Sequence, residues 1–415
     1  MRLGVYYSAN TASGDGIGTI AEDMLRGVLT AVQGSGHELV VFTDDAGAAS
    51  RSAPPLGVTW VKVGSLRGLP SVKKRINRVF SHGLLLPAPF ASESSLDPFL
   101  YEAGIDLLIN MGPDTATMSV PYVCMVSDLL HRSQPYMPEV SAHGAWERLE
   151  AQYRQVLGRA TFVIAGTRAG RREIVRFYQI PRARVVKLPH PTPGFAIAAA
   201  QAPPPPRPGY LRDTPFLLYP AAFWPHKNHV TLLEALALLR RDHQTDVQLV
   251  LAGPDRGNKA FVLERMAAMG LSDAVHVRGV VDRPELVALY RHALALTYVS
   301  TCGPEHLPAL EAFALGCPVV NTDVPGAREQ LGSAAVFVSA TDPASIADGV
   351  LTLHCDPARR ACLAAAGREI AAARTPERFA CELFEAIAPF AQKRKNWSAW
   401  QPFDRPHRFG RLFGR

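Results

Sequence analysis

The stretch from residue 293 to residue 320 constrains this chain more than any other. Residues 293–299 form a short apolar run rich in strand-forming residues, and residues 318–320 begin a second run. Between them, Pro308 stands where the first turn of a helix tolerates proline, and Gly316 stands where helices commonly stop. The pattern predicts a strand, a loop, a short helix and a second strand, as in a parallel sheet.

This arrangement points backbone N–H groups and the positive end of a helix dipole out of the carboxyl edge of the sheet, which suits a phosphate. Glu311 lies one turn into the predicted helix and is placed to accept hydrogen bonds from ligand hydroxyl groups. A βα unit with an ordinary surface glutamate is the other interpretation. The local pattern alone favours that second interpretation.

The rest of the chain repeats the same alternation of strands and helices. Before residue 200, strands are predicted at 2–7, 38–43, 106–110, 122–126 and 160–165. After it, strands are predicted at 216–219, 247–252, 275–279 and 293–299, with helices at 231–239, 259–269 and 284–292 between them. Alternation at this spacing indicates α/β domains with doubly wound parallel sheets.

Four consecutive prolines at 203–206 mark the clearest linker, because proline cannot donate to a sheet and stiffens the chain. The 415 residues suffice for two domains, each with its own core. We predict four parts: a first α/β domain at 1–198, a linker at 199–213, a second α/β domain at 214–390 and a basic aromatic tail at 391–415.

Composition limits the partners. The six cysteines show no spacing suited to zinc, so we expect reduced thiols, no metal site and a cytoplasmic protein. The first seven residues are too short for a signal peptide, and no run is long enough to span a membrane. The net charge of +7 fits an anionic ligand. No nucleic-acid recognition motif is present.

Residues 66–90 differ in character from the rest. Apolar residues at 72, 76, 79 and 80 share one helical face, and basic residues crowd the remainder. Such a segment can lie on the inner face of an anionic membrane. A surface helix that packs on the domain core is the alternative, and both stay open.

The second half of the opening stretch resembles a motif of glycosyltransferase family 4. It reads Leu-Pro-Ala-Leu-Glu311-Ala-Phe-Ala-Leu-Gly316-Cys-Pro318-Val, beside the family's Glu-Ala-Met-Ala-x-Gly-x-Pro-Val. The resemblance implies the GT-B fold, in which two Rossmann-like domains face each other across a cleft. It also implies retaining, metal-independent transfer from a nucleotide sugar, with no further cofactor.

The resemblance assigns roles in the second domain. Lys227 matches the family's diphosphate-binding lysine, and its place at a helix start, where the dipole disfavours cations, by itself indicates an anion partner. Glu311 would bind the ribose. Further donor-binding positions in this domain follow from the same comparison: Gly253, Gly279, Val280, Leu307, Pro308 and Leu310.

In the first domain, the loop Gly14-Asp-Gly16-Ile-Gly18 resembles the family's glycine loop beside the sugar and the pyrophosphate, with Gly16 as the binding position. Its spacing is not that of a dinucleotide-binding motif. Asp128, at a predicted strand end, resembles the aspartate of the family's His-Asp pair, where it could orient sugar hydroxyl groups. Alternatively, Asp128 caps the following turn.

Three positions depart from the family pattern. Ser127 replaces a histidine, Ala222 an arginine and Gly303 the first glutamate of the motif. Glu305 is the nearest other carboxylate, and Arg278 or His226 could replace the missing arginine, although the motif supports none of these substitutions.

We therefore predict a hexosyltransferase with Lys227, Asp128 and Glu311 as catalytic residues. A mannose-like or glucose-like hexose would move from a GDP- or UDP-linked donor to a surface polysaccharide or lipid-linked glycan. A non-catalytic nucleotide-sugar-binding or scaffold protein on the same fold is the alternative. An epimerase or a phosphorylase is a weaker third hypothesis.

Overall fold

The computed structural model describes residues 1–7, 16–43, 57–63, 96–112, 117 and 119–397. The chain divides into two compact units. One consists of Met1–Met125, Gln155–Ile164 and Ala380–Arg415, and the other of Val126–Arg154 and Ala165–Phe379. The predicted domain boundaries at 198 and 214 stay predictions.

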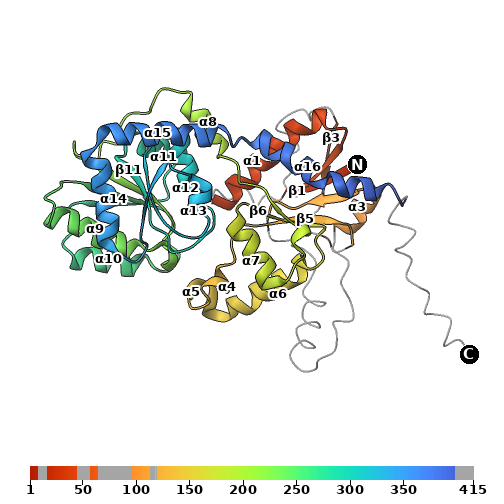
Figure 1. Cartoon of the computed structure of the whole chain (residues 1–415), viewed down its shortest axis with the longest axis horizontal. Helices are drawn as coiled ribbons and strands as arrows, with labels where there is room; N and C mark the ends of the chain where they lie inside the picture. Colours follow the sequence, from red (N-terminus) through yellow and green to blue (C-terminus); the bar gives the residue numbers. More distant parts are fainter. Residues whose placement is uncertain (8–15, 44–56, 64–95, 113–116, 118, 398–415) are drawn as a thin grey trace, which may run out of the picture. The chain divides into compact units, whose positions relative to one another are not determined.

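The first sheet has seven strands in the order β3-β2-β1-β4-β5-β6-β7 (Figure 1). Its strands are β1 Arg2–Tyr7, β2 Glu38–Thr43, β3 Val58–Lys62, β4 Leu107–Ile109, β5 Tyr122–Val126, β6 Phe162–Ala165 and β7 Val185–Lys187. The pairings of β1 with β2 and with β4 are parallel. Strand order therefore reverses between β1 and β4. The loop that follows β1 lies outside the described residues.

The described helices from α1 to α7 and the last described helix, α16, are short or amphipathic. They are α1 Gly16–Ala31, α3 Asp97–Glu102, α4 Leu130–Ser133, α5 Pro138–Ser141, α6 Ala145–Leu157, α7 Arg168–Tyr178 and α16 Pro376–Arg394. Thr167 caps α7, because its side chain accepts a hydrogen bond from the backbone N–H of Gly170 at 3.1 Å.

The second sheet has six strands in the order β10-β9-β8-β11-β12-β13. Its strands are β8 Phe216–Pro220, β9 Gln248–Ala252, β10 Val275–Gly279, β11 Ala295–Tyr298, β12 Val319–Thr322 and β13 Ala335–Val338. All its pairings are parallel. Strands β9 and β11 are buried throughout, as expected when helices cover both faces.

Helices pack on both faces of this sheet (Figure 1). They are α8 Gly194–Ala200, α9 His229–Arg241, α10 Lys259–Ala268, α11 Arg283–His292, α12 Leu307–Leu315, α13 Ala327–Leu331, α14 Pro343–Cys355 and α15 Pro357–Ala372. Helix α9 packs with α10 and α14, whereas α12 packs with α8, α11 and α15. The reversal of strand order between β8 and β11 marks the switch point, where parallel α/β sheets bind ligands.

The prediction of two doubly wound parallel α/β sheets is confirmed. Helix α8 ends at Ala200, close to the start of the predicted linker at residue 199, and the linker bounds stay predictions. An alanine-rich segment propagates a helix readily, and the chain leaves it before the four prolines. The basic segment 66–90 and the tail from residue 398 lie outside the described residues.

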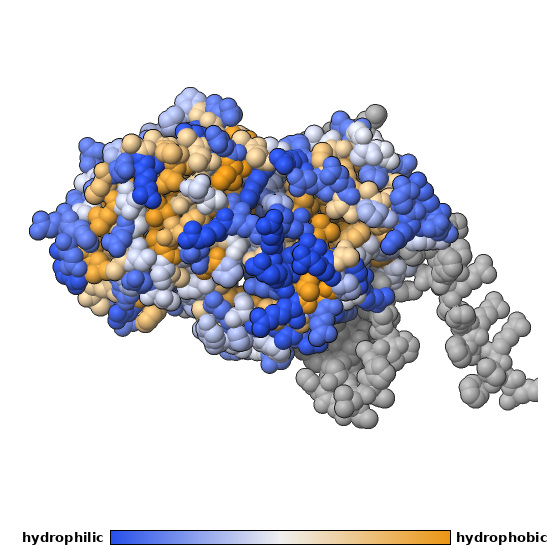
Figure 2. Space-filling view, in the orientation of Figure 1, coloured by the Kyte–Doolittle hydropathy of each residue, from blue (hydrophilic) through white to orange (hydrophobic). Residues whose placement is uncertain are grey.

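In the described residues, no helix is long and apolar enough to cross a membrane. On the face drawn in Figure 2, hydrophilic and apolar side chains are intermixed. The predicted membrane contact therefore stays a prediction.

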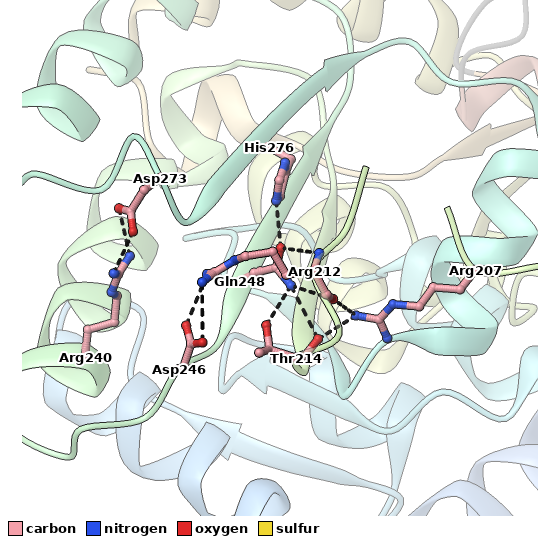
Figure 3. A network of polar contacts seen from close by, with 8 residues as sticks. All are labelled: Arg207, Arg212, Thr214, Arg240, Asp246, Gln248, Asp273 and His276. Atoms are coloured by element: carbon pink, nitrogen blue, oxygen red, sulfur yellow. Dashed lines mark hydrogen bonds and ion pairs between the residues drawn. The ribbon is translucent and has the colours of Figure 1, made fainter. Parts of the chain in front are cut away.

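A polar network fastens the end of the predicted linker to the second sheet (Figure 3). Gln248, fully buried in β9, accepts a hydrogen bond from the backbone N–H of Arg212 at 3.1 Å and donates to the hydroxyl of Thr214 at 2.8 Å. His276 Nε2 lies 2.9 Å from the same Gln248 oxygen. Arg207 donates to the carbonyl of Arg212 at 2.8 Å. One buried amide thus fixes where the linker enters the sheet.

We expect Gln248→Leu to lower the free energy of unfolding by about 2–4 kcal/mol, because several buried polar groups lose their partners. Urea denaturation followed by circular dichroism measures this change. The control is Arg240→Gln, which removes a partly exposed ion pair with Asp273 and should cost at most about 1 kcal/mol. Equal losses in the two variants would contradict this role of Gln248.

Candidate functional site

Lys227 lies in the loop that follows β8, at the switch point of the second sheet. The loop ends in a 3-10 turn, Pro225–Lys227, and Asn228 then adopts the left-handed conformation with φ of +61°. The Asn228 amide donates to the carbonyls of Val299 at 3.1 Å and Ala340 at 2.7 Å. These bonds tie the loop to the segments that follow β11 and β13, so the backbone on both sides of Lys227 is fixed.

The ammonium group of Lys227 is held at the end of β11. Its Nζ donates to the hydroxyl of Tyr298 at 2.7 Å and lies 5.2 Å from the centre of that ring. Burial opposes the charge, but Tyr298, Cys302 and Asp128 outweigh burial and raise the pKa of Lys227. Lys227 therefore carries a positive charge at neutral pH in a partly dehydrated place. Such a charge attracts anions more strongly than an exposed lysine does.

Asp128 is exposed, and its Oδ1 accepts a hydrogen bond from the backbone N–H of Leu130 at 3.0 Å. This bond is the turn cap that the sequence left open as an alternative. Asp128 is also close enough to Lys227 to raise the pKa of the lysine. The structure thus brings these two predicted residues into one electrostatic environment.

His226 and Glu139 form a buried pair beside Lys227. Glu139 Oε1 lies 3.1 Å from the backbone nitrogen of His226, which donates to it, and 2.5 Å from His226 Nδ1. Burial, followed by the charge of Lys227, lowers the pKa of His226, although Glu139 opposes this effect. A neutral His226 bonded to a carboxylate does not replace the missing arginine as a fixed cation.

Arg278, the other residue considered for that role, is engaged elsewhere. Its Nε donates to Glu285 Oε1 at 3.2 Å, and its guanidinium lies 4.2 Å from the centre of the Tyr210 ring. Ala222 therefore leaves this position without a substitute cation from either candidate.

The loop between β11 and α12 has its own backbone geometry. Gly303 has a φ of +104°, which side-chain-bearing residues rarely adopt. A Cβ at Gly326 would lie 2.5 Å from the carbonyl oxygen of Pro304, so the loop packs directly on a glycine. The position of the missing glutamate is thus a turn that glycine suits best.

Glu305 does not take over the role of the missing glutamate. Its carboxylate contacts His190, and both side chains are almost fully buried. A Cβ at Gly166 would overlap this carboxylate. Glu305 is therefore committed to a buried pair that anchors the loop.

His306, the last residue of the loop before α12, packs against the ring of Tyr298. The two ring centres are 4.6 Å apart, and His306 Nδ1 lies 3.0 Å from Asn321 Oδ1. The backbone N–H of His306 donates to Gln330 at 2.7 Å. Burial lowers the pKa of His306 to about 4, so His306 is neutral and supports Tyr298 without adding charge.

Helix α12 begins at Leu307, and its N-cap residue makes no side-chain capping bond. The first amides of a helix have no partners within the helix, so those of Leu307, Ala309 and Leu310 are suited to an anion; Pro308 has no N–H. The Tyr290 hydroxyl donates to Glu311 Oε2 at 2.7 Å, and its oxygen lies 3.3 Å from the carbonyl oxygen of Pro308. Tyr290 thereby orients Glu311.

Strands β8, β9 and β10 end together beside this site. A Cβ at Gly253 would lie 2.2 Å from the carbonyl oxygen of Ala221, which explains the glycine. The Gly253 N–H donates to the carbonyl of Gly279 at 2.6 Å, and Gly279 has a φ of +66°. Val280 follows with 76% of its surface exposed, an unusual place for a branched apolar side chain and one suited to a flat ligand.

Gly16 is the first residue of α1 and belongs to the other compact unit. Its predicted role beside the pyrophosphate stays a prediction. In the described part of the chain, no three His, Cys, Asp or Glu side chains are grouped in a way that could hold a metal ion.

Sequence reasoning missed Glu139, Tyr298 and His306. Tyr298 was read only as part of a buried strand, although its place as the last residue of β11 was a usable signal. Glu139 comes from a segment far from Lys227 in the sequence, so only the fold reveals it.

Comparison with known proteins gives the family. Residues 207–370 match the model of group 1 glycosyl transferases. This segment of the chain is therefore similar to that family. The predicted resemblance is confirmed at this level for the part of the chain that carries Lys227, Glu311 and the two strand-end glycines.

Curated proteins with similar sequences carry related names. A D-inositol 3-phosphate glycosyltransferase of Pseudarthrobacter chlorophenolicus is 31% identical over 223 residues, covering 51% of this chain and 52% of the relative. The O-antigen chain mannosyltransferase B of Escherichia coli is 27% identical over 217 residues, covering 52% and 57%. The chain thus spans about half the length of the curated relatives it matches.

Solved structures share the fold along most of the chain. Sucrose-phosphate synthase of Thermosynechococcus elongatus has a TM-score of 0.67 at 18% identity and covers 95% of this chain and 100% of its own. Anabaena HepE, in complex with UDP-glucose, has a TM-score of 0.61 at 16% identity and covers 93% and 100%. These similarities establish the two-sheet fold.

We expect stability to fall as the pH drops from about 6.5 toward 4. The folded-state pKa of His306 is about 4, below the ordinary value of about 6.5, so the unfolded chain binds more protons in this window. The shift corresponds to about 3 kcal/mol. Urea denaturation between pH 7.5 and 4.5 should show a smaller loss for His306→Gln than for the wild type. Parallel pH curves would contradict this assignment.

Proposed function

We propose that this protein is a glycosyltransferase that moves a hexose from a nucleoside diphosphate sugar to a glycan or lipid-linked glycan. The observation that carries the proposal is the half-buried ammonium group of Lys227, held at the switch point of the second sheet beside the start of α12. A diphosphate needs this combination of a fixed cation and helix-end amides.

In such a transfer, negative charge develops on the departing diphosphate, and the transition state is stabilised by groups that bind this charge. Lys227 and the first amides of α12 are preorganised donors for that charge, since Tyr298 and Asn228 hold the lysine and its backbone before any ligand binds. In this proposal the two groups supply the electrostatic stabilisation themselves, and transfer proceeds without a divalent cation or a covalent intermediate on the protein.

The nucleoside would lie over the ends of β9 and β10. Glu311, oriented by Tyr290, accepts hydrogen bonds from the ribose. The glycines at 253 and 279 let the backbone approach the base, and the exposed side chain of Val280 covers it. Asp128 orients hydroxyl groups of the transferred sugar.

The donor is UDP- or GDP-linked in this proposal. Anabaena HepE was solved with UDP-glucose, and the Escherichia coli relative is named a mannosyltransferase. The acceptor is a polyhydroxylated molecule, in line with the names of the relatives. We place the reaction in the cytoplasm, with acceptors reached at the membrane surface.

A non-catalytic nucleotide-sugar-binding protein is the second candidate. Gly303 and Ala222 favour it, because a glutamate and an arginine of the family pattern are missing there and neither Glu305 nor Arg278 replaces them. Release of free nucleoside diphosphate from the donor in the presence of acceptor separates the two candidates.

We expect Lys227→Ala and Glu311→Ala each to weaken nucleotide binding at least about tenfold, since each removes a charged contact to the ligand. A thermal-shift panel of UDP, GDP, ADP and TDP, each with and without its glucose or mannose, measures this effect, because binding to the folded state raises the melting temperature.

The matched controls are Arg241→Ala in the last turn of α9 and Glu264→Ala on α10, two exposed residues of the same unit that should leave the shifts unchanged. If the folded wild type shifts with no nucleotide, the proposed function is wrong.

A further inference from the structure

Glu139 carries a carboxylate oxygen that the fold leaves without a partner. Glu139 lies on α5, and only 5% of its side chain is exposed. Its Oε1 accepts from the backbone N–H and from the ring of His226. Its Oε2 is buried and has no hydrogen-bond partner among the described residues.

We expect this oxygen to accept a hydrogen bond from a ligand. An ionised carboxylate can only accept hydrogen bonds, and buried polar atoms in folded proteins are nearly always paired. The side chain is also held in place by its two bonds to His226, so Oε2 presents a fixed acceptor.

Glu139 is joined to the Lys227 loop through His226. His226, its partner, is the neighbour of Lys227 in the chain. The segment that contains Glu139 is also bonded to the loop after β11. The Gln134 amide donates to the Thr301 carbonyl at 3.0 Å, and the Thr301 hydroxyl donates to the Gln134 side-chain oxygen at 3.4 Å. Both Glu139 and Lys227 act on the thiol of Cys302, with opposite effects on its pKa.

The chemistry of the missing partner follows from the charges. Glu139 and Asp128 are both carboxylates, so a second anion at Oε2 would be repelled, whereas a neutral hydroxyl is a suitable donor. A hydroxyl that lies beside a diphosphate held by Lys227 belongs to the sugar attached to that diphosphate.

We propose that Glu139 Oε2 accepts a hydrogen bond from a hydroxyl group of the donor hexose. Glu139 is then a sugar-binding residue that supplies the carboxylate absent at Gly303, a role that Glu305 cannot fill because it is paired with His190. This inference rests on the proposed function.

Isothermal titration of wild type, Glu139→Gln and Glu139→Ala with UDP, UDP-glucose, GDP and GDP-mannose tests the inference. Glu139→Gln keeps an oxygen for His226 but removes the charge. We expect affinity for the nucleotide sugar to fall at least about fivefold and affinity for the matching diphosphate to stay within about twofold. Glu147→Gln, an exposed acid on α6, is the matched control and should change neither.

Deoxy donors identify the hydroxyl. The wild type should bind one of the 2-, 3-, 4- or 6-deoxy forms of the sugar nucleotide more weakly than the complete donor. Glu139→Gln should bind that deoxy form and the complete donor equally well, because the variant no longer has the carboxylate that accepts from this hydroxyl. If the Glu139 variants bind the diphosphate and the nucleotide sugar with equally reduced affinity, Glu139 only positions His226. If neither affinity changes, Oε2 binds no ligand. Either result overturns the inference. A wild type that binds none of the four nucleotides overturns the proposed function itself.

Discussion

The hydrogen bond between Lys227 and Tyr298 is the interaction on which the site depends. Burial alone would favour the neutral amine, yet the balance of surrounding groups keeps the pKa of Lys227 raised. The Tyr298 hydroxyl meets the ammonium at 2.7 Å, and His306 packs against the same ring. Among the described residues, no carboxylate forms an ion pair with this lysine, so its charge remains available to an external anion.

Topology explains why these groups meet. Strand order reverses between β8 and β11, so the loops that leave the two strands diverge to opposite faces of the sheet and open a space at its edge. The first loop brings Lys227 and the second brings α12. Residues 126–154 belong to the same compact unit, and they add Asp128 and Glu139 to the site.

The sequence predicted the strands around the switch point well, because parallel strands covered on both faces are continuous apolar runs bounded by glycine and proline. It also singled out Lys227 and Glu311, which stand at fixed offsets from strand and helix ends. The features that the sequence did not predict also have physical reasons. Glu139 reaches His226 only through long-range packing, which no local pattern contains.

Hydrogen–deuterium exchange with and without UDP or GDP tests the central claim most directly. The account predicts slower exchange in two segments that are distant in sequence: the turn around Lys227 and Asn228, and the first turn of α12, where Leu307, Ala309 and Leu310 contribute amides. Protection confined to other parts of the chain, with both segments unchanged when a nucleotide is bound, would contradict the proposed diphosphate site.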